Sequence, residues 1–305
     1  MSRNAWIGLT AGLVVAVGVG VGALVAALGS SETGSSQPPP PASSTFGNFS
    51  LPLLESSSTL ALAGHDRNLL VGIAAKRPGP VEIAALRAET PIPTDDLRIA
   101  VDGRTVEAEP CGQGCSRVPA DELSGRRSSL TVREGSSEVA FTLPAALPAD
   151  GAKIFARAQR TMDALHSFRF TERLSSGGRP VFTRVDVQAP NRLRLRTTGG
   201  YRSVIIGRGR WDYQGGRWER TPFPGLSVAD ALMWFRAGHP RVLSHRGGVT
   251  RLAAFGLQPV PAWFWLDVAP SGRVLQAEML APSHFMLHRY RDFNGGISIT
   301  PPTRK

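Results

Sequence analysis

The sequence predicts a mainly β protein of the α+β class, in which an immunoglobulin-like β-sandwich precedes one long antiparallel sheet with two helices against its apolar face. Three observations predict this fold. Short β-branched runs separated by turn residues fill residues 49–145, a helix-forming segment begins near residue 150, and strand-like runs follow it to the carboxyl end. Several short strands at close spacing are typical of antiparallel sandwiches.

Residues 6–28, "WIGLTAGLVVAVGVGVGALVAAL", are apolar and uncharged. As a helix they would span about 35 Å, enough to cross a bilayer. Arg3 precedes them and no basic residue follows before Arg67, so the positive-inside rule places the bulk of the chain outside the cytoplasm. We predict an uncleaved transmembrane signal-anchor at residues 1–29. A cleaved signal peptide is the alternative, but its apolar region is usually shorter.

A Ser/Pro-rich linker at residues 30–48 then separates the predicted anchor from the folded part. The predicted sandwich covers residues 49–145 and includes runs such as "STLALAG", "NLLVGIAA", "DLRIAV" and "SEVAFTLP". Its only cysteines, Cys111 and Cys115, form an even pair in a compartment where disulfides persist, so we predict that they are bridged. A two-thiolate metal site is the alternative, but no histidine lies near them in the sequence.

The second predicted domain covers residues 148–305. Asp150 can cap a helix over "GAKIFARAQRTMDALHSF", and in "NRLRLRTT" leucines alternate with arginines, which predicts a strand with one apolar and one wet face. A second helix is predicted over "SVADALMWFRAGH", where Ser227 and Asp230 have capping-box spacing. Hairpins and the final strand "HFMLHRYRDF" complete the sheet.

Charge divides the chain unevenly. Residues 150–305 carry 24 Lys+Arg and 10 Asp+Glu, whereas residues 1–149 carry 11 and 14, and only three of the cations are lysines. Because arginine binds phosphate and carboxylate in a fixed fork, the second half suits anionic head groups or an acidic protein partner. A GC-rich genome explains the same arginine usage equally well. No helix-turn-helix, zinc-finger or RNP-type pattern is present, so nucleic acid is not a predicted partner.

The order of the second-domain elements resembles a known superfamily. Over about residues 150–302 the chain resembles the superfamily of the bacterial lipoprotein carrier LolA, the sensor RseB and the mycobacterial LppX-type lipoproteins. The resemblance rests on the order of a helix before "ALHSFRFTER", then "QAPNRLRLR", "VIIGRGRWDY", a helix, "WFWLDV", "GRVLQAEML" and "HRYRDFN". The resemblance implies a half-barrel that wraps an apolar cavity. It also implies a hydrophobic ligand, such as a lipid or acyl chain, or a lipidated partner of the cell envelope.

The two-domain layout is similar to an actinobacterial group of envelope proteins in which a CopC-like β-domain precedes such a module, and this resemblance implies copper handling. The sequence lacks the amino-terminal histidine and the Met-rich segment that such copper carriers use. In "SHFMLHRYRDF", however, His284, Met286 and His288 would share one strand face, and their donor atoms suit copper. The other interpretation of this face is a cavity wall, with the histidines bonded to backbone or to Tyr290.

Apolar positions on the predicted helices and strands form the candidate cavity lining: Ile154, Ala158, Met162, Leu193, Leu195, Met233, Phe235 and Met286. No nucleophile elbow, zinc-protease motif, P-loop or dinucleotide fingerprint is present, so an enzyme is not predicted. No cofactor is predicted either, and copper belongs only to the alternative interpretation. We therefore predict a membrane-anchored extracytoplasmic protein that holds or senses a hydrophobic ligand. A copper-handling protein and a scaffold without ligand are the alternatives.

Overall fold

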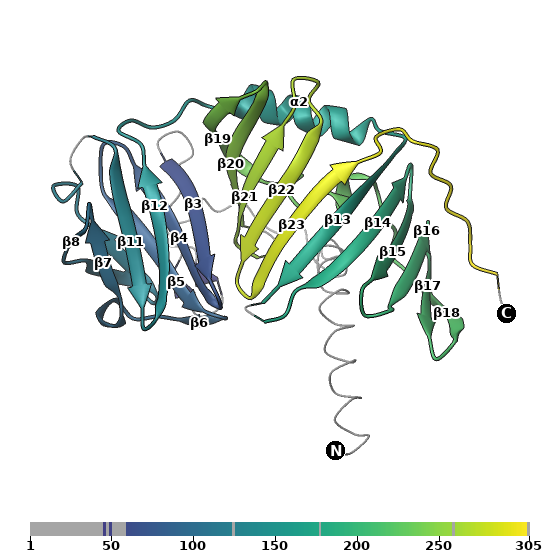
Figure 1. Cartoon of the computed structure of the whole chain (residues 1–305), viewed down its shortest axis with the longest axis horizontal. Helices are drawn as coiled ribbons and strands as arrows, with labels where there is room; N and C mark the ends of the chain where they lie inside the picture. Colours follow the sequence, from purple (N-terminus) through teal and green to yellow (C-terminus); the bar gives the residue numbers. More distant parts are fainter. Residues whose placement is uncertain are drawn as a thin grey trace, which may run out of the picture.

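The computed structural model describes residues 59–303 apart from 124–125, 177 and 258–259, together with the short strands β1 (Thr45–Phe46) and β2 (Phe49–Ser50). The predicted signal-anchor and most of the predicted linker lie outside the described residues. Among the described residues, no helix is both long and apolar enough to cross a membrane. Two β-rich bodies lie side by side, one built from β3–β12 and one from β13–β23 (Figure 1).

The first body is a sandwich of two antiparallel sheets. One has the order β3-β4-β5-β10-β9 with β6 paired to β5, and the other has the order β12-β11-β7-β8. The elements are β3 (Thr59–Asp66), β4 (Leu69–Lys76), β5 (Val81–Arg87), β6 (Thr90–Pro91), η1 (Thr94–Asp96), β7 (Arg98–Val101), β8 (Arg104–Thr105), β9 (Glu109–Gly112), β10 (Cys115–Val118), β11 (Ser128–Glu134) and β12 (Ser137–Leu143). An immunoglobulin-like relationship stays a prediction.

Burial along these strands shows which faces are covered. Strand β12 alternates strictly between buried and exposed residues, because one face packs in the sandwich core and the other meets solvent. Strand β4 is buried over nearly its whole length. The second face of β4 is buried because it contacts the other body. Packing within the sandwich alone would bury only one face of this strand.

The second body is an 11-stranded antiparallel sheet that curves into a half-barrel, with the order β18-β17-β16-β15-β14-β13-β23-β22-β21-β20-β19 (Figure 1). This confirms the predicted mainly β fold with a half-barrel. The strands are β13 (Ser167–Ser175), β14 (Val181–Gln188), β15 (Arg192–Thr197), β16 (Arg202–Ile206), β17 (Gly209–Gln214), β18 (Arg217–Pro222), β19 (Gly238–Arg246), β20 (Val249–Gly256), β21 (Ala262–Val268), β22 (Val274–Ala281) and β23 (His284–Arg291).

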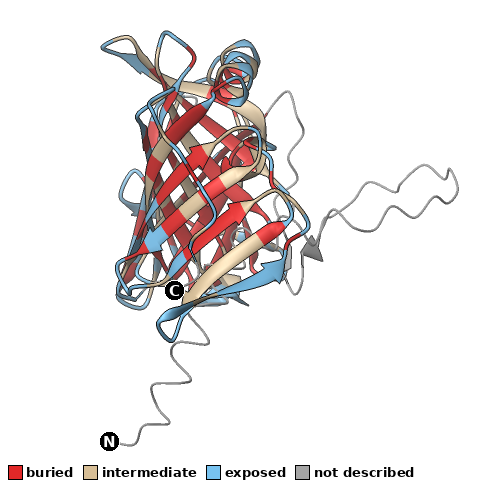
Figure 2. Cartoon of the chain, turned by 90° about the vertical axis from the view of Figure 1, so that its right-hand side faces the viewer, coloured by how far each residue is buried: buried red, intermediate tan, exposed pale blue. Residues whose placement is uncertain are grey.

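Helix α2 (Ala152–Asp163) covers one face of this sheet, which we call the inner face. The Asp150 carboxylate accepts the backbone N–H of Ala152 at 2.9 Å, near the predicted start of the helix. Phe155, Ala158 and Met162 recur at helical spacing and are buried in one core with residues from both halves of the sheet. Figure 2 shows the strands largely buried or intermediate, while the turns are mostly exposed.

The predicted second helix over residues 227–239 is wrong. The capping contacts form, since Ser227 N–H donates to the Asp230 carboxylate at 2.8 Å, but only one 3₁₀ turn follows, η2 (Ala229–Ala231). Leu232 and Trp234 are both buried in the core. Residues two apart point to nearly opposite sides of an α-helix, so burying both against one core favours a non-helical chain. One helix and this loop, instead of two helices, cover the inner face.

The outer face of β20–β22 packs against the sandwich. Phe255, Trp263, Leu280 and Phe285 from the half-barrel form one buried cluster with residues of β3, β4 and β5 from the sandwich, which are Ala61, Ala63, Leu70 and Leu86. The Trp263 indole lies directly against the backbone of Gly72 on β4, so close that a Cβ on Gly72 would overlap the ring. The two bodies therefore share an apolar interface.

Candidate functional site

The inner face carries a row of polar side chains across four adjacent strands. His288 on β23 lies opposite Glu172 on β13, Glu172 lies opposite Thr183 on β14, and Thr183 lies opposite Thr197 on β15. We call these four residues the polar row. At the usual spacing between strands the row extends over about 15 Å. On its α2 side lies the apolar core, and on its other side lie Met286, Leu174 and Val181.

At one end of the polar row a histidine and a glutamate are bonded inside the protein. His288 is buried, and its Nε2 lies 2.8 Å from the Glu172 carboxylate. Its Nδ1 lies 3.2 Å from the Tyr290 hydroxyl, and its ring stacks on Phe170 with centroids 4.4 Å apart. Burial raises the pKa of the Tyr290 hydroxyl, which therefore stays protonated. This end of the row is a fixed, hydrogen-bonded network.

At the other end, three buried hydroxyl groups have no hydrogen-bond partner among the described residues. They belong to Thr183 and Thr197 of the polar row and to Ser203 on β16, which lies on the same face beside Leu195. An unpaired buried hydroxyl costs about 1–3 kcal/mol. Buried polar groups in native proteins are nearly always bonded to protein or water, so unpaired hydroxyls beside a bonded pair are the arrangement expected where a polar ligand group or water binds.

In the structure, most of the residues predicted to line a cavity belong to one hydrophobic core or pack against it, and their role in binding a ligand stays a prediction. Ala158, Met162, Leu193 and Leu195 are buried in the inner-face core, and Ile154, Met233 and Phe235 pack against it. Met233 and Phe235 do so from the loop after η2 instead of from a helix. Met286 is also buried on the inner face, next to the polar row. Residues of helix α2 and Trp234 belong to the same core.

The copper alternative requires His284, Met286 and His288 to face one ion. They do alternate along β23, but both ring nitrogens of His288 already have partners, and His284 Nδ1 lies 3.0 Å from the Pro282 carbonyl oxygen. Among the described residues, no group of three or more His, Cys, Asp and Glu side chains is placed to hold a metal. The other metal candidates, Cys111 and Cys115, are joined by a disulfide between β9 and β10.

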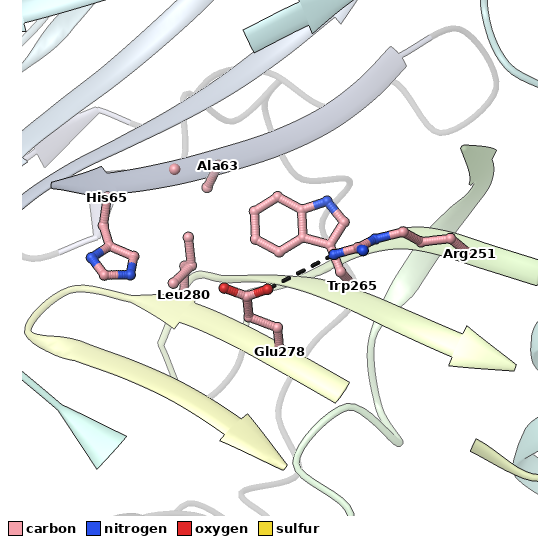
Figure 3. Close-up of a pocket in the computed structure, with 7 residues that line it drawn as sticks. Ala63, His65, Arg251, Trp265, Glu278 and Leu280 are labelled. Carbon is pink, nitrogen blue, oxygen red and sulfur yellow. Dashed lines mark ion pairs between the residues drawn. The ribbon is translucent and has the colours of Figure 1, made fainter. Parts of the chain in front are cut away.

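A hollow lies between the two bodies. It has a volume of about 290 Å³ and is lined by Ala63, Gly64, His65, Arg251, Trp265, Glu278 and Leu280 (Figure 3). Burial raises the pKa of the Glu278 carboxyl, and its nearest cation, Arg251, is 3.9 Å away. Burial also lowers the pKa of His65, whose ring stacks on Phe285. Both effects favour the neutral forms of these two groups.

Sequence reasoning found His288 but missed Glu172, the hydroxyl groups and the hollow between the bodies. Glu172 and His288 are 116 positions apart and meet only through the pairing of β13 with β23. One signal was available. In "SFRFTERL" the alternation Phe168, Phe170, Glu172 puts an acid on the same face as two aromatic residues, which is unusual for an apolar strand face.

No protein-family model matches the chain, and neither does any curated protein. Solved structures with a similar fold include lipoprotein LppX of Mycobacterium tuberculosis, with 14% identity over 49% of this chain and 99% of that chain, at a TM-score of 0.37. LprF of Mycobacterium bovis is 11% identical over 52% of this chain and 99% of that chain, with a TM-score of 0.36. A LolA superfamily protein of Nitrosomonas europaea is 15% identical over 49% of this chain and 95% of that chain, with a TM-score of 0.24. These likenesses concern the fold of about half of the chain.

Proposed function

We propose that the protein is a binding protein, not an enzyme, and that its half-barrel holds an amphiphilic ligand such as a lipid on the inner face. The polar part of the ligand would bond to Thr183, Thr197 and Ser203, near the Glu172–His288 pair. Its apolar part would lie against the neighbouring apolar side chains of β13 and β23. The observation that supports this is the set of buried hydroxyls without partners on the inner face, between the apolar core and the apolar residues Met286, Leu174 and Val181.

The proposal includes the location. The apolar segment at residues 6–28 would anchor the chain in the cytoplasmic membrane, with the two β-rich bodies outside the cytoplasm. A binding protein tethered in this way has its ligand, a membrane lipid or a lipidated envelope protein, in the adjacent bilayer. The disulfide between Cys111 and Cys115 fits such a compartment.

The test removes the hydroxyls without changing side-chain shape. In the double variant T183V/T197V we expect affinity for a dansyl-labelled fatty acid, followed by its fluorescence, to fall about 10-fold or more, because hydrogen bonds to a charged head group contribute about 1.5–3 kcal/mol each. Resistance to urea should stay the same or rise, because a buried unpaired hydroxyl is removed. The matched control is T59V, which removes another buried unpaired hydroxyl, but on β3 of the sandwich.

Loss of probe binding with retained stability in T183V/T197V, and unchanged binding in T59V, supports the proposal. A wild-type chain that binds no fatty-acid probe, or a double variant that binds it as tightly as the wild type, contradicts it. The copper alternative predicts a different result, namely one copper ion per chain that is lost in H284Q. A scaffold predicts neither ligand.

A further inference from the structure

We propose that the outer face of the half-barrel, opposite the candidate ligand site, docks onto a bilayer surface that contains anionic phospholipids. The observation is a row of arginines across three adjacent strands. Arg184 on β14 lies directly opposite Arg196 on β15, and Arg196 lies directly opposite Arg202 on β16. All three side chains are exposed. We call them the arginine row, and it spans about 10 Å at the usual strand spacing.

Like charges directly opposite each other destabilise a sheet, so an arginine row needs a counter-charge. The neighbouring row on the same face has one, because the buried Asp186 carboxylate lies between Arg169 and Arg194 and pairs with both. The arginine row has much less. Its one carboxylate contact is between Arg184 and Asp186, at 3.9 Å, and Asp186 is already paired more closely with Arg169 and Arg194.

Within the described residues no carboxylate pairs with Arg196 or Arg202. Arg202 instead lies over the Tyr213 ring, 5.1 Å from its centroid. A surface that places three guanidinium groups side by side, with only one shared carboxylate at 3.9 Å from Arg184, is complementary to a dense array of anions. Guanidinium groups bind phosphate in a fixed, bidentate geometry, which the head groups of a bilayer offer at high density.

Apolar and aromatic side chains border the arginine row. Phe182, two residues before Arg184 on the same strand face, is 48% exposed, which is the largest value among the exposed large hydrophobic residues described. Tyr213 and Trp218 lie at the other end, with ring centroids 5.2 Å apart. Exposed phenylalanine, interfacial tyrosine and tryptophan, and arginine together match the depth profile of a membrane surface. A soluble phosphate would need none of the aromatic residues.

This inference does not depend on the inner-face ligand, because the two sites lie on opposite faces of the same strands. The residues alternate along each strand, as Thr183 and Arg184 do on β14, or Arg196 and Thr197 on β15. Docking would orient the half-barrel on the membrane whether or not the ligand is a lipid. A failure of T183V/T197V to lose probe binding would therefore leave the docking proposal standing, and the reverse also holds.

The test uses the full chain reconstituted into liposomes, with F182C labelled by an environment-sensitive fluorophore without reductant, since Cys111 and Cys115 are bridged. In liposomes of phosphatidylcholine with phosphatidylglycerol we expect the emission to shift to the blue, and in phosphatidylcholine alone we expect no shift. Raising the salt concentration should reverse the shift. Anchoring through residues 6–28 is common to both liposome types and cancels in the comparison.

In the F182C background, the triple variant R184Q/R196Q/R202Q should lose the shift. Its thermal stability should be unchanged or higher because like-charge repulsion is removed. The matched control R98Q/R104Q/R133Q removes three exposed arginines from the four-stranded sheet of the sandwich and should keep the shift. Equal emission in both liposome types, a shift retained by the triple variant, or a shift caused by inorganic phosphate in phosphatidylcholine liposomes would overturn the proposal.

Discussion

At the scale of single residues, His65 makes stability depend on pH. Burial is the main cause of its lowered pKa, and the charge of Arg173 adds to it. The unfolded chain, with the usual pKa of 6.5, then binds a proton more readily than the folded chain. The contribution of the neutral His65 to stability is therefore fully present above pH 6.5 and is lost as the pH falls through the lowered folded pKa. We expect H65F to reduce this loss, measured by urea unfolding at a series of pH values.

Phenylalanine suits this test because it can keep the stacking on Phe285 and removes the buried, unpartnered Nδ1. The control is H166Q, because the His166 side chain is exposed and its bonds are made by the backbone: its N–H donates to Asn294 and its carbonyl accepts from Ala189. H166Q should keep the wild-type loss of stability in acid. If H65F loses as much stability on acidification as the wild type, His65 is not the group that titrates.

The histidines also show how far the sequence alone reaches. Alternation along residues 284–288 placed His284, Met286 and His288 on one face of a strand. In the structure His284 bonds to a backbone carbonyl and His288 bonds to Tyr290. These are the bonds that the cavity-wall interpretation expected. Glu172 could not be predicted, because strand register between β13 and β23 decides which acid meets His288. Alternation gives the face of a residue, but not its partner on a distant strand.

At the scale of elements, Asp186 joins three strands. Its carboxylate on β14 pairs with Arg169 on β13 and with Arg194 on β15, at 2.6 Å for Arg194. Burial alone would raise the pKa of this carboxyl, but the hydrogen bonds from the two arginines outweigh burial and lower it. The carboxylate therefore stabilises the fold above its unfolded pKa of 3.8, and this stabilisation is lost as the pH falls through the lower folded value.

We expect D186N to cost roughly 2–4 kcal/mol at neutral pH, because it removes the acid that two partly buried arginines share, and of these only Arg169 keeps another carboxylate, that of Asp292. Chemical denaturation gives the value. The control E219Q removes an acid that pairs with Arg217 at 2.8 Å on the exposed strand β18, and should cost about 0–1 kcal/mol. Equal costs for the two variants would show that Asp186 does not join the strands energetically.

The elements themselves were predictable to different degrees. The period of 3.6 over α2 and the period of 2 over β15 are local, and both were predicted. The second helix was predicted but does not form, although its capping residues Ser227 and Asp230 form the expected bonds. Capping involves only neighbouring residues of the chain. The burial of Leu232 and Trp234, in contrast, depends on tertiary contacts with the sheet and α2. In this segment packing outweighs local propensity.

At the scale of the whole molecule, the interface between the two bodies could not be predicted from either body alone. In "AWFWLDV" the residues of both strand faces are largely buried, because one face packs under α2 and the other meets the sandwich. A strand that is apolar on both faces is expected to pack against another element on each face, but its sequence does not say which element packs on the second face. Trp263 against Gly72 is the contact that identifies it, and we expect this contact to link the stabilities of the two bodies.

The variant G72A tests this link. The added methyl group would overlap the Trp263 ring, so the two bodies must separate locally, at a cost of about 1–3 kcal/mol. We expect hydrogen exchange to show β3–β12 and β13–β23 losing protection together in the wild type but at different denaturant concentrations in G72A. The matched control is G64A, whose methyl group would overlap Val139 within the sandwich. Because that overlap leaves the interface intact, G64A should lower the stability of both bodies together. If G72A and G64A keep the bodies equally coupled, the interface holds them in place without linking their unfolding.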